Sequence, residues 1–141
     1  MQNEGNPVVD EKLRQKAIEA MSNSYSPYSV RQVGAVIKLS NGKEYTGCNI
    51  ENSSFGATVC AERVAIWKAV SENGGDVQIE TVVVATDASP PWPPCGLCRQ
   101  VINEFVAKKC EVHLVNKKGE VKSFTHRDLL PEGFDRSALN K

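Results

Sequence analysis

The sequence predicts an α/β protein, a three-layer α/β/α sandwich built on a mixed sheet of about five strands. Segments with helical periodicity alternate along the chain with β-rich runs, which is typical of a sheet covered by helices on both faces. Residues 79–86, IETVVVAT, form a largely β-branched run, as expected for a strand buried on both sides. The length of 141 residues suits one core, so residues 1–141 are predicted to form a single domain.

The first half of the chain is predicted to hold a helix, a hairpin and a second helix. Apolar side chains recur at helical spacing within residues 9–23, which indicates an amphipathic helix. After the proline-interrupted connector SYSPYSV, two β-rich runs within residues 32–52 flank Asn41-Gly42, a turn signal typical of a β-hairpin. A helix is expected over residues 58–72, and it ends at ENGGD because glycine is favoured just past a helix C-terminus.

The second half continues the alternation after the buried strand. The proline-rich segment DASPPWPP is expected to be a rigid loop that leads into a helix over residues 95–108. Strand-like runs at 110–116 and 120–125 flank Lys118-Gly119, and HRDLL is expected to form a short helix. The predicted order is therefore α-β-β-α-β-α-β-β-α.

Charge and composition exclude several classes of partner. The 17 basic residues balance the 17 acidic ones, whereas proteins that hold long nucleic acids usually present a net basic face. No window of 18 apolar residues is present, and the N-terminal MQNEGNPVVDEKLRQK has no apolar signal-peptide core. We therefore expect a cytoplasmic protein whose partner is a small neutral molecule rather than a nucleic acid or a membrane.

The five cysteines are expected to be reduced. An odd number without a secretion signal argues against a disulfide framework, and clustered cysteines in a reducing compartment more often bind metal or act in catalysis. Cys48 and Cys110 lie apart from the other three, at positions 60, 95 and 98, and are interpreted as small buried hydrophobic side chains.

Three of the cysteines fall at the predicted starts of two helices. Cys95-x-x-Cys98 alone could be a redox pair, half of a zinc site or two packed thiols, but Cys60 adds a third thiol from a second helix start. The positive end of a helix dipole lowers a thiol pKa and so favours the thiolate that zinc binds. Three protein ligands leave a fourth tetrahedral position for water, which is typical of catalytic rather than structural zinc.

Glu62 follows Cys60 by two residues, in the first turn of the same predicted helix. Its carboxylate could simply complement the helix dipole. Beside a water at a zinc site it could instead take up a proton and pass it to a leaving group, and the three thiols favour this interpretation. Arg63, and Arg99 beside Cys98, could hydrogen-bond the sulfurs and offset the negative charge of three thiolates.

These motifs, with others in the same order, resemble the small homotetrameric cytidine deaminases. The shared segments are YSPYS at 25–29, VGA at 33–35, NIEN at 49–52, GATVCAER at 56–63, PCGLCRQ at 94–100 and LLPEGF at 129–134. The resemblance covers about residues 10–134 and implies a homotetramer that deaminates a cytidine-type nucleoside in pyrimidine salvage, with water entering and ammonia leaving. It also implies that Cys60, Cys95 and Cys98 hold Zn²⁺ and that Glu62 carries the proton.

The resemblance further implies a set of substrate-binding residues. Asn49 and Glu51 of NIEN would hydrogen-bond the ribose, and the backbone around Ala61 and Pro94 would read the edge of the pyrimidine. Phe134 would reach the base pocket of a neighbouring subunit.

One position departs from this family. The family usually has Tyr-Ser-x-Phe-x-Val-Gly, with the Phe stacked on the base, whereas this chain has YSVRQVG and Arg31 in the Phe position. Arg31 could point to solvent while another aromatic ring covers the base. It could also line the base pocket and favour a pyrimidine that carries an acceptor or an acid. Trp92 could line the mouth of the pocket or serve packing alone.

Three other functions fit the zinc motif. A blasticidin-type or other modified-pyrimidine deaminase would use the same zinc and Glu62, and Arg31 favours it, whereas NIEN favours a nucleoside. A nucleic-acid-editing deaminase would be expected to add a basic or aromatic surface. A structural zinc module would need a fourth protein ligand, and neither thiol motif contains one.

Overall fold

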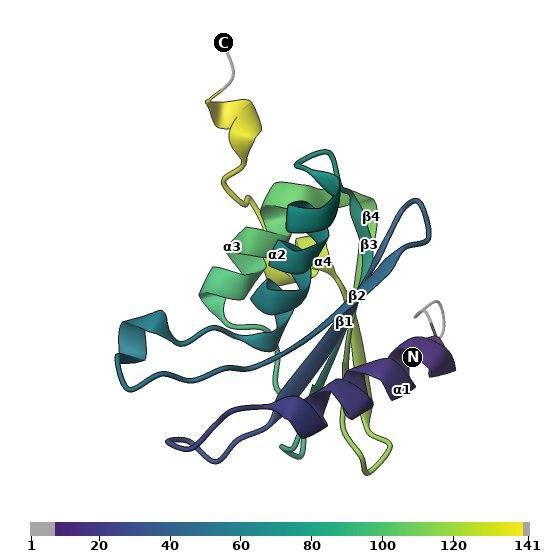
Figure 1. Cartoon of the computed structure of the whole chain (residues 1–141). Coiled ribbons are helices and arrows are strands. Elements are labelled where there is room, and N and C mark those ends of the chain that lie inside the picture. Colours follow the sequence, from purple (N-terminus) through teal and green to yellow (C-terminus); the bar gives the residue numbers. More distant parts are fainter. Residues whose placement is uncertain (1–7, 140–141) are drawn as a thin grey trace.

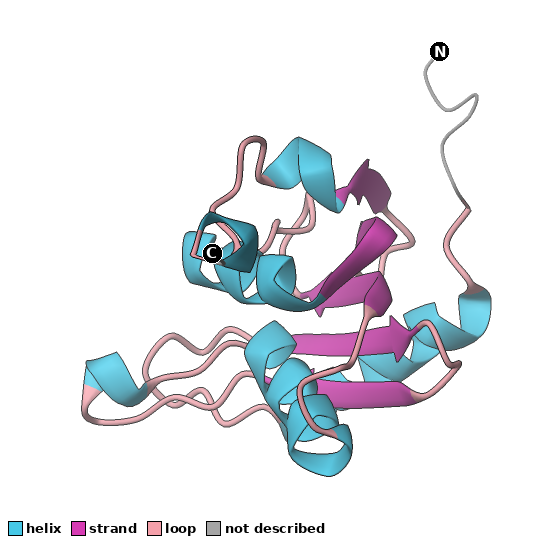
Figure 2. Ribbon diagram, turned by 90° about the horizontal axis from the view of Figure 1, so that it is seen from above, coloured by secondary structure: helices cyan, strands magenta, loops and turns pink. Residues whose placement is uncertain are grey.

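A five-stranded mixed sheet with helices on both faces forms the body of the protein (Figures 1 and 2). The computed structural model describes residues 8–139, so the first seven residues of the polar N-terminal segment discussed above lie outside it. The helices are α1 (Glu11–Ala20), α2 (Ala61–Asn73), α3 (Gly96–Phe105) and α4 (His126–Leu129), with 3₁₀ turns at Met21–Asn23, Phe55–Ala57 and Arg136–Ala138. The strands are β1 (Val33–Leu39), β2 (Glu44–Cys48), β3 (Ile79–Thr86), β4 (Val106–Val115) and β5 (Val121–Thr125). No helix within the described range is long and apolar enough to cross a bilayer.

The strands follow the order β2-β1-β3-β4-β5. β1 runs antiparallel to both β2 and β3, β3 and β4 are parallel, and β4 and β5 are antiparallel. The predicted hairpin is β1–β2, and Gly42 in its turn has a φ of 91°, a conformation that glycine adopts without steric cost. The predicted three-layer sandwich, mixed sheet and element order are confirmed.

The predicted start of the second helix and the predicted end of the third were each wrong by three residues. The helix expected from residue 58 begins at Ala61, because Val59 forms an antiparallel bridge with Ile50 and is therefore held extended. The helix expected to reach residue 108 ends at Phe105, because Val106 already pairs with Ile79 in the parallel part of the sheet. In both places a tertiary backbone pairing overrides the local helical pattern.

Each face of the sheet has its own apolar layer. On one face α1 packs against β1, β3 and β4 through Leu13, Ala17, Met21, Val36, Val83, Ala85 and Val115. On the other face α2 and α3 pack on alternate residues of the same strands through Ala65, Ile66, Ile102, Ile37, Val82, Val84, Val112 and Leu114. The alternation follows from the two-residue period of a strand. Cys110 is buried in the second layer as expected, whereas Cys48 is half-buried at the end of β2.

The sheet register brings the starts of α2 and α3 together. β2 and β3 are both antiparallel to β1, so they are parallel to each other, and Cys48 and Ala85 both pair with Gly34. The two strands therefore end at the same edge of the sheet, where ligands commonly bind in open α/β folds. Gly47 allows the first turn of α2 to approach β2, since a Cβ there would lie 2.4 Å from the carbonyl oxygen of Ala61.

Candidate active site

Three sulfurs meet at this edge of the sheet. Cys60 caps α2, Cys95 caps α3 and Cys98 lies in the first turn of α3. Their Sγ atoms all lie within 4.8 Å of one another, and those of Cys60 and Cys95 are 3.8 Å apart. Tetrahedral zinc with bonds of about 2.3 Å to sulfur separates two such ligands by about 3.8 Å. The three thiols therefore could hold Zn²⁺ after a small contraction.

The protons of the cluster are unevenly shared. A hydrogen bond from the Cys98 thiol, assisted by Arg63 and Cys95, lowers the pKa of Cys60 to about 5 against the effect of burial. Because the Cys98 thiol donates this hydrogen bond, it holds its proton. The hydrogen bond, together with burial and the negative charge of Glu62, raises the pKa of Cys98 far above the ordinary value. One thiolate is thus stable in the cluster by itself, and further thiolates need a cation close by, which is what a divalent metal supplies.

The two arginines beside the thiols differ in what they contact. Arg63 donates from Nη2 to the Sγ of Cys60 at 3.5 Å, as expected. Arg99 instead donates to two carbonyl oxygens, from Nε to Pro94 at 2.8 Å and from Nη1 to Leu129 at 2.9 Å. This differs from the expected sulfur contact because the residue after a helical cysteine projects about 100° away around the axis. Arg99 therefore ties the loop before α3 to α4.

Glu62 is 3% exposed in the first turn of α2. Burial, followed by the negative charge of Cys60, raises the pKa of its carboxyl to about 7. A buried carboxyl beside a thiol cluster is placed where a general acid–base group would be needed. Ala61, next to it, is fully buried.

Glu51 is buried and accepts three hydrogen bonds from the segment before β1. Its Oε1 accepts from the amides of Tyr28 at 2.9 Å and Ser29 at 3.0 Å, and its Oε2 accepts from the Ser29 hydroxyl. The Ser29 hydroxyl contributes most to lowering the pKa of this carboxyl. A carboxylate has about four acceptor positions, so one stays available for a substrate hydroxyl.

Asn49 holds the same segment from its other end. Its Oδ1 accepts from the amide of Val33 at 2.9 Å, and its Nδ2 donates to the carbonyl of Arg31 at 2.8 Å. The amide group retains one donor and one acceptor position. The sequence predicted only a ribose contact for Asn49 and Glu51, and their bonds to the 28–33 segment were not predicted.

A cleft of about 410 Å³ adjoins Glu51. Its lining residues are Tyr28, Ser29, Glu51, Phe55 and Thr58. Thr58, in this lining, is two residues before Cys60 in the chain. Of this lining only Glu51 was predicted to bind the substrate within the same chain, although Tyr28 and Ser29 belong to the YSPYS motif.

Arg31 lies half-exposed between two side chains. Its Nη1 is 3.4 Å from Oδ1 of Asp87, and its guanidinium carbon is 5.1 Å from the ring centroid of Trp92. Asp87 was not predicted as a site residue, although its position directly after the buried strand β3 places it at the edge where the site lies.

Phe134 is 59% exposed, near the C-terminal half of α3. Its carbonyl oxygen accepts from Gln100 Nε2 at 2.9 Å and from Asn103 Nδ2 at 3.0 Å. These bonds fix the backbone of the C-terminal segment and leave the aromatic ring at the surface.

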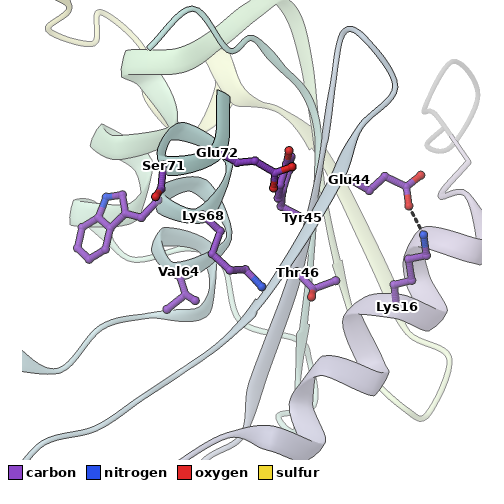
Figure 3. A pocket seen from close by; sticks show the side chains of 9 residues that line it. Lys16, Glu44, Tyr45, Thr46, Val64, Lys68, Ser71 and Glu72 are labelled. Atoms are coloured by element: carbon purple, nitrogen blue, oxygen red, sulfur yellow. Dashed lines mark hydrogen bonds and ion pairs between the residues drawn. The ribbon is translucent and has the colours of Figure 1, made fainter. Parts of the chain in front are cut away.

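A larger groove lies elsewhere on the described part of the molecule. It has a volume of about 970 Å³ and runs between α2 and the edge strand β2 (Figure 3). Its lining comprises Lys16, Glu44, Tyr45, Thr46, Val64, Trp67, Lys68, Ser71 and Glu72, with an ion pair between Lys16 and Glu44. It contains neither a cysteine nor Glu62, and we do not assign the chemistry to it.

Comparison with known proteins agrees with this geometry. Residues 7–114 match the model of the cytidine and deoxycytidylate deaminase zinc-binding region. A cytidine deaminase from Halalkalibacterium halodurans is 42% identical over 128 residues, which cover 91% of this chain and 96% of that protein. A cytidine deaminase from Sporosarcina psychrophila is also 42% identical, over 92% of this chain and 94% of its own length.

Solved structures show the same architecture. The cytidine deaminase of Burkholderia pseudomallei superposes with a TM-score of 0.82 at 36% identity, covering 90% of this chain and all of that one. The cytidine deaminase of Mycobacterium tuberculosis gives a TM-score of 0.72 at 32% identity, over 90% and 98% of the two chains. The chain therefore belongs to the cytidine and deoxycytidylate deaminase family.

Proposed function

We propose that this protein is a zinc-dependent hydrolase that converts cytidine or deoxycytidine to the uridine-type product with release of ammonia. The observation that carries the proposal is the placement of three thiols within 4.8 Å of one another beside the buried carboxyl of Glu62. Family membership and the curated cytidine deaminase relatives support the reaction and the metal.

Cys60, Cys95 and Cys98 would hold the zinc, and Arg63 would offset part of the thiolate charge by its hydrogen bond to Cys60. When bound, zinc supplies a Lewis acid that makes water nucleophilic near neutral pH. The thiolates share negative charge with the metal, so the hydrogen bond from Arg63 also preserves part of its Lewis acidity.

Glu62 carries the protons of the reaction. It takes one proton from the attacking water and delivers it to the ring nitrogen, and it then moves the remaining proton of that water, from the new hydroxyl on the ring carbon, to the exocyclic amine as that group leaves. A carbon–oxygen bond forms, the carbon–nitrogen bond breaks, and ammonia and the carbonyl product result. Because Glu62 is 3% exposed, it exchanges protons with the bound reactants rather than with bulk solvent.

Asn49 and Glu51 would bind the ribose through the hydrogen-bonding positions that remain to them, as counted above. The backbone around Ala61 and Pro94 would contact the edge of the pyrimidine ring. This arrangement favours a nucleoside over a free base, because a free base leaves both buried side chains without their ligand.

We further propose a cytoplasmic homotetramer. Five free cysteines suit a reducing compartment. Trp67 is 50% exposed on α2 beside the groove of Figure 3, and Phe134 is exposed near α3, so both could contact another subunit. Light scattering after gel filtration tests the assembly, and a monomer would contradict it.

The function is tested by incubating zinc-loaded protein with cytidine, deoxycytidine, a base-substituted cytidine and a single-stranded oligonucleotide, with ammonia release as the readout. We expect ammonia from the first two. Ammonia from the oligonucleotide alone would indicate an editing enzyme, and a strong preference for the substituted nucleoside would indicate a modified-pyrimidine deaminase. No ammonia from any of the four would overturn the proposal.

A further inference from the structure

Arg31, Asp87 and Trp92 come from three segments and meet at one end of the sheet. Arg31 precedes β1, Asp87 follows β3, and Trp92 lies in the loop that leads to α3. The pairing of Val33 with Thr86 brings the first two together. The guanidinium of Arg31 then pairs with Asp87 at 3.4 Å and covers the ring of Trp92 at 5.1 Å.

Hydrogen bonds hold the backbone at the amide and at the carbonyl of Arg31. Its amide donates to the Ser29 hydroxyl at 3.1 Å, its carbonyl accepts from Asn49, and the next amide along the chain donates to Asp87 at 3.1 Å. Val30, immediately before it, has a φ of 64°, which a β-branched residue rarely adopts. Such a conformation persists where the surrounding contacts determine it, so the direction of the Arg31 side chain is fixed by its neighbours.

The backbone of Trp92 is also restrained by its neighbours. Prolines 91 and 93 flank it and restrict the backbone, and its amide donates to Oγ1 of Thr86 at 3.1 Å. It is three residues from Cys95, so their Cα atoms are at most about 11 Å apart. The indole is 43% exposed while the guanidinium covers part of it. It therefore offers a pre-positioned aromatic surface in the loop that leads to Cys95.

The charge of Arg31 is already partnered. The side chains of Arg31 and Asp87 are 50% and 32% exposed, and pairs with such exposure add little to folding stability. Because Asp87 neutralises the guanidinium, Arg31 is poorly suited to bind an acid on a substrate. The other interaction of the guanidinium is its contact with the indole of Trp92.

We propose that Trp92 forms the stacking surface for the pyrimidine and that Arg31, tied by Asp87, is a positioning residue that holds the indole in place. This inference rests on the proposed function, since it takes a cytidine-type nucleoside as the planar ligand. Stacking on an aromatic side chain changes affinity by about 5- to 150-fold per base and depends little on ring substituents. The preferred substrate is therefore a neutral cytidine-type nucleoside rather than one bearing an acid.

A double-mutant cycle tests the arrangement through kcat and KM for cytidine. Trp92→Ala should raise KM at least about fivefold while the zinc content and kcat change less. Arg31→Ala should raise KM by a smaller factor, and the double variant should be no worse than Trp92→Ala, because Arg31 acts through Trp92. If the rise in KM of the double variant equalled the product of the two single rises, Arg31 would contact the substrate itself. An unchanged KM in Trp92→Ala would show that the pyrimidine does not stack on Trp92. Either result overturns the inference.

Binding without turnover separates this inference from the proposed function. The chain has two tryptophans, so Trp67→Phe leaves Trp92 as the single indole. Titration of that variant with uridine, the product, should quench its fluorescence to a plateau. If uridine quenches the fluorescence of Trp67→Phe while the protein releases no ammonia from cytidine, the stacking surface is supported and the proposed function is contradicted. Ammonia release with no quenching would overturn the stacking surface alone.

Discussion

The Sγ atoms of Cys60 and Cys95 lie 3.8 Å apart although 35 residues separate them in the chain. β2 and β3 end at the same edge of the sheet, and each leads through a loop to the start of a helix that one of these cysteines caps. The separation equals that of two sulfurs on tetrahedral zinc, at about 3.8 Å. The topology of the sheet thus assembles a candidate zinc-ligand set that neither helix provides alone.

Zinc content should depend on this set of thiols. Replacement of Cys95 by Ala should reduce the metal measured per chain well below one, because two thiols and water bind zinc less tightly than three thiols and water. Cys48→Ala is the matched control, since this cysteine lies outside the cluster, and it should retain about one zinc. Full occupancy in Cys95→Ala would contradict the ligand assignment.

Glu62→Gln should keep the fold and the zinc but lose turnover. An amide preserves the size of the side chain and removes its capacity to accept and release a proton, and general acid–base catalysis contributes about 10²–10⁴-fold. The measurement is kcat with cytidine, alongside metal content and thermal melting. Turnover close to that of the parent in a folded, zinc-loaded variant would rule out Glu62 as the proton carrier.

Asn49→Ala and Glu51→Gln should weaken nucleoside binding. A buried polar partner left unpaired costs about 1–3 kcal/mol, which corresponds to a rise in KM of about 5- to 150-fold. Cytosine, which has no ribose, should be a poor substrate for the parent protein. Equal kcat/KM for cytosine and cytidine would show that Asn49 and Glu51 do not bind the ribose and serve only to hold the 28–33 segment.

Gly47→Ala should destabilise the protein and disturb the metal site together. A Cβ at this position would lie 2.4 Å from the Ala61 carbonyl and 2.7 Å from the Ala65 amide, both backbone atoms that cannot rotate away. Overpacking of this kind costs about 1–3 kcal/mol, or several degrees in Tm for a domain of this size. Gly56→Ala is the control, because nothing lies within 4 Å of its Cβ, and its Tm should be unchanged.

Stability should fall on acidification partly through His126. Nε2 of this buried side chain donates a hydrogen bond to Oδ1 of Asn103 at 3.0 Å, and burial, followed by the charge of Arg99, lowers the pKa of the imidazole. The unfolded state, with a histidine pKa of about 6.5, therefore binds the proton first as the pH falls, which favours unfolding. The contribution of neutral His126 to the free energy of unfolding is fully present above a pH of about 6.5. It is lost as the pH falls towards the lower pKa of His126 in the folded state.

Urea unfolding of zinc-loaded protein at a series of pH values between about 7 and 5 measures this effect. In His126→Gln the free energy of unfolding should fall less over that interval than in the parent protein. Parallel pH curves for the two proteins would exclude His126 as a contributor.

The sequence alone determined the order of the elements, the hairpin at Asn41-Gly42, the buried strand β3 and the candidate zinc ligands. These features depend on short-range signals, namely periodicity, turn residues and the spacing of cysteines around helix starts. The helix boundaries at Ala61 and Phe105 were out of reach, because they are set by pairing with Ile50 and Ile79 in other segments.

Only the tertiary structure decided how the polar side chains around the thiols are engaged. Asn49 and Glu51 were predicted to contact the ribose, but their bonds to the 28–33 segment depend on how that loop lies against the segment that follows β2. Arg31 finds Asp87 because β1 and β3 are antiparallel neighbours, and Trp92 joins them from a loop that sequence spacing cannot position. A side chain's partner is decided by the three-dimensional path of distant segments, whereas its chemical capacity is already present in the residue type.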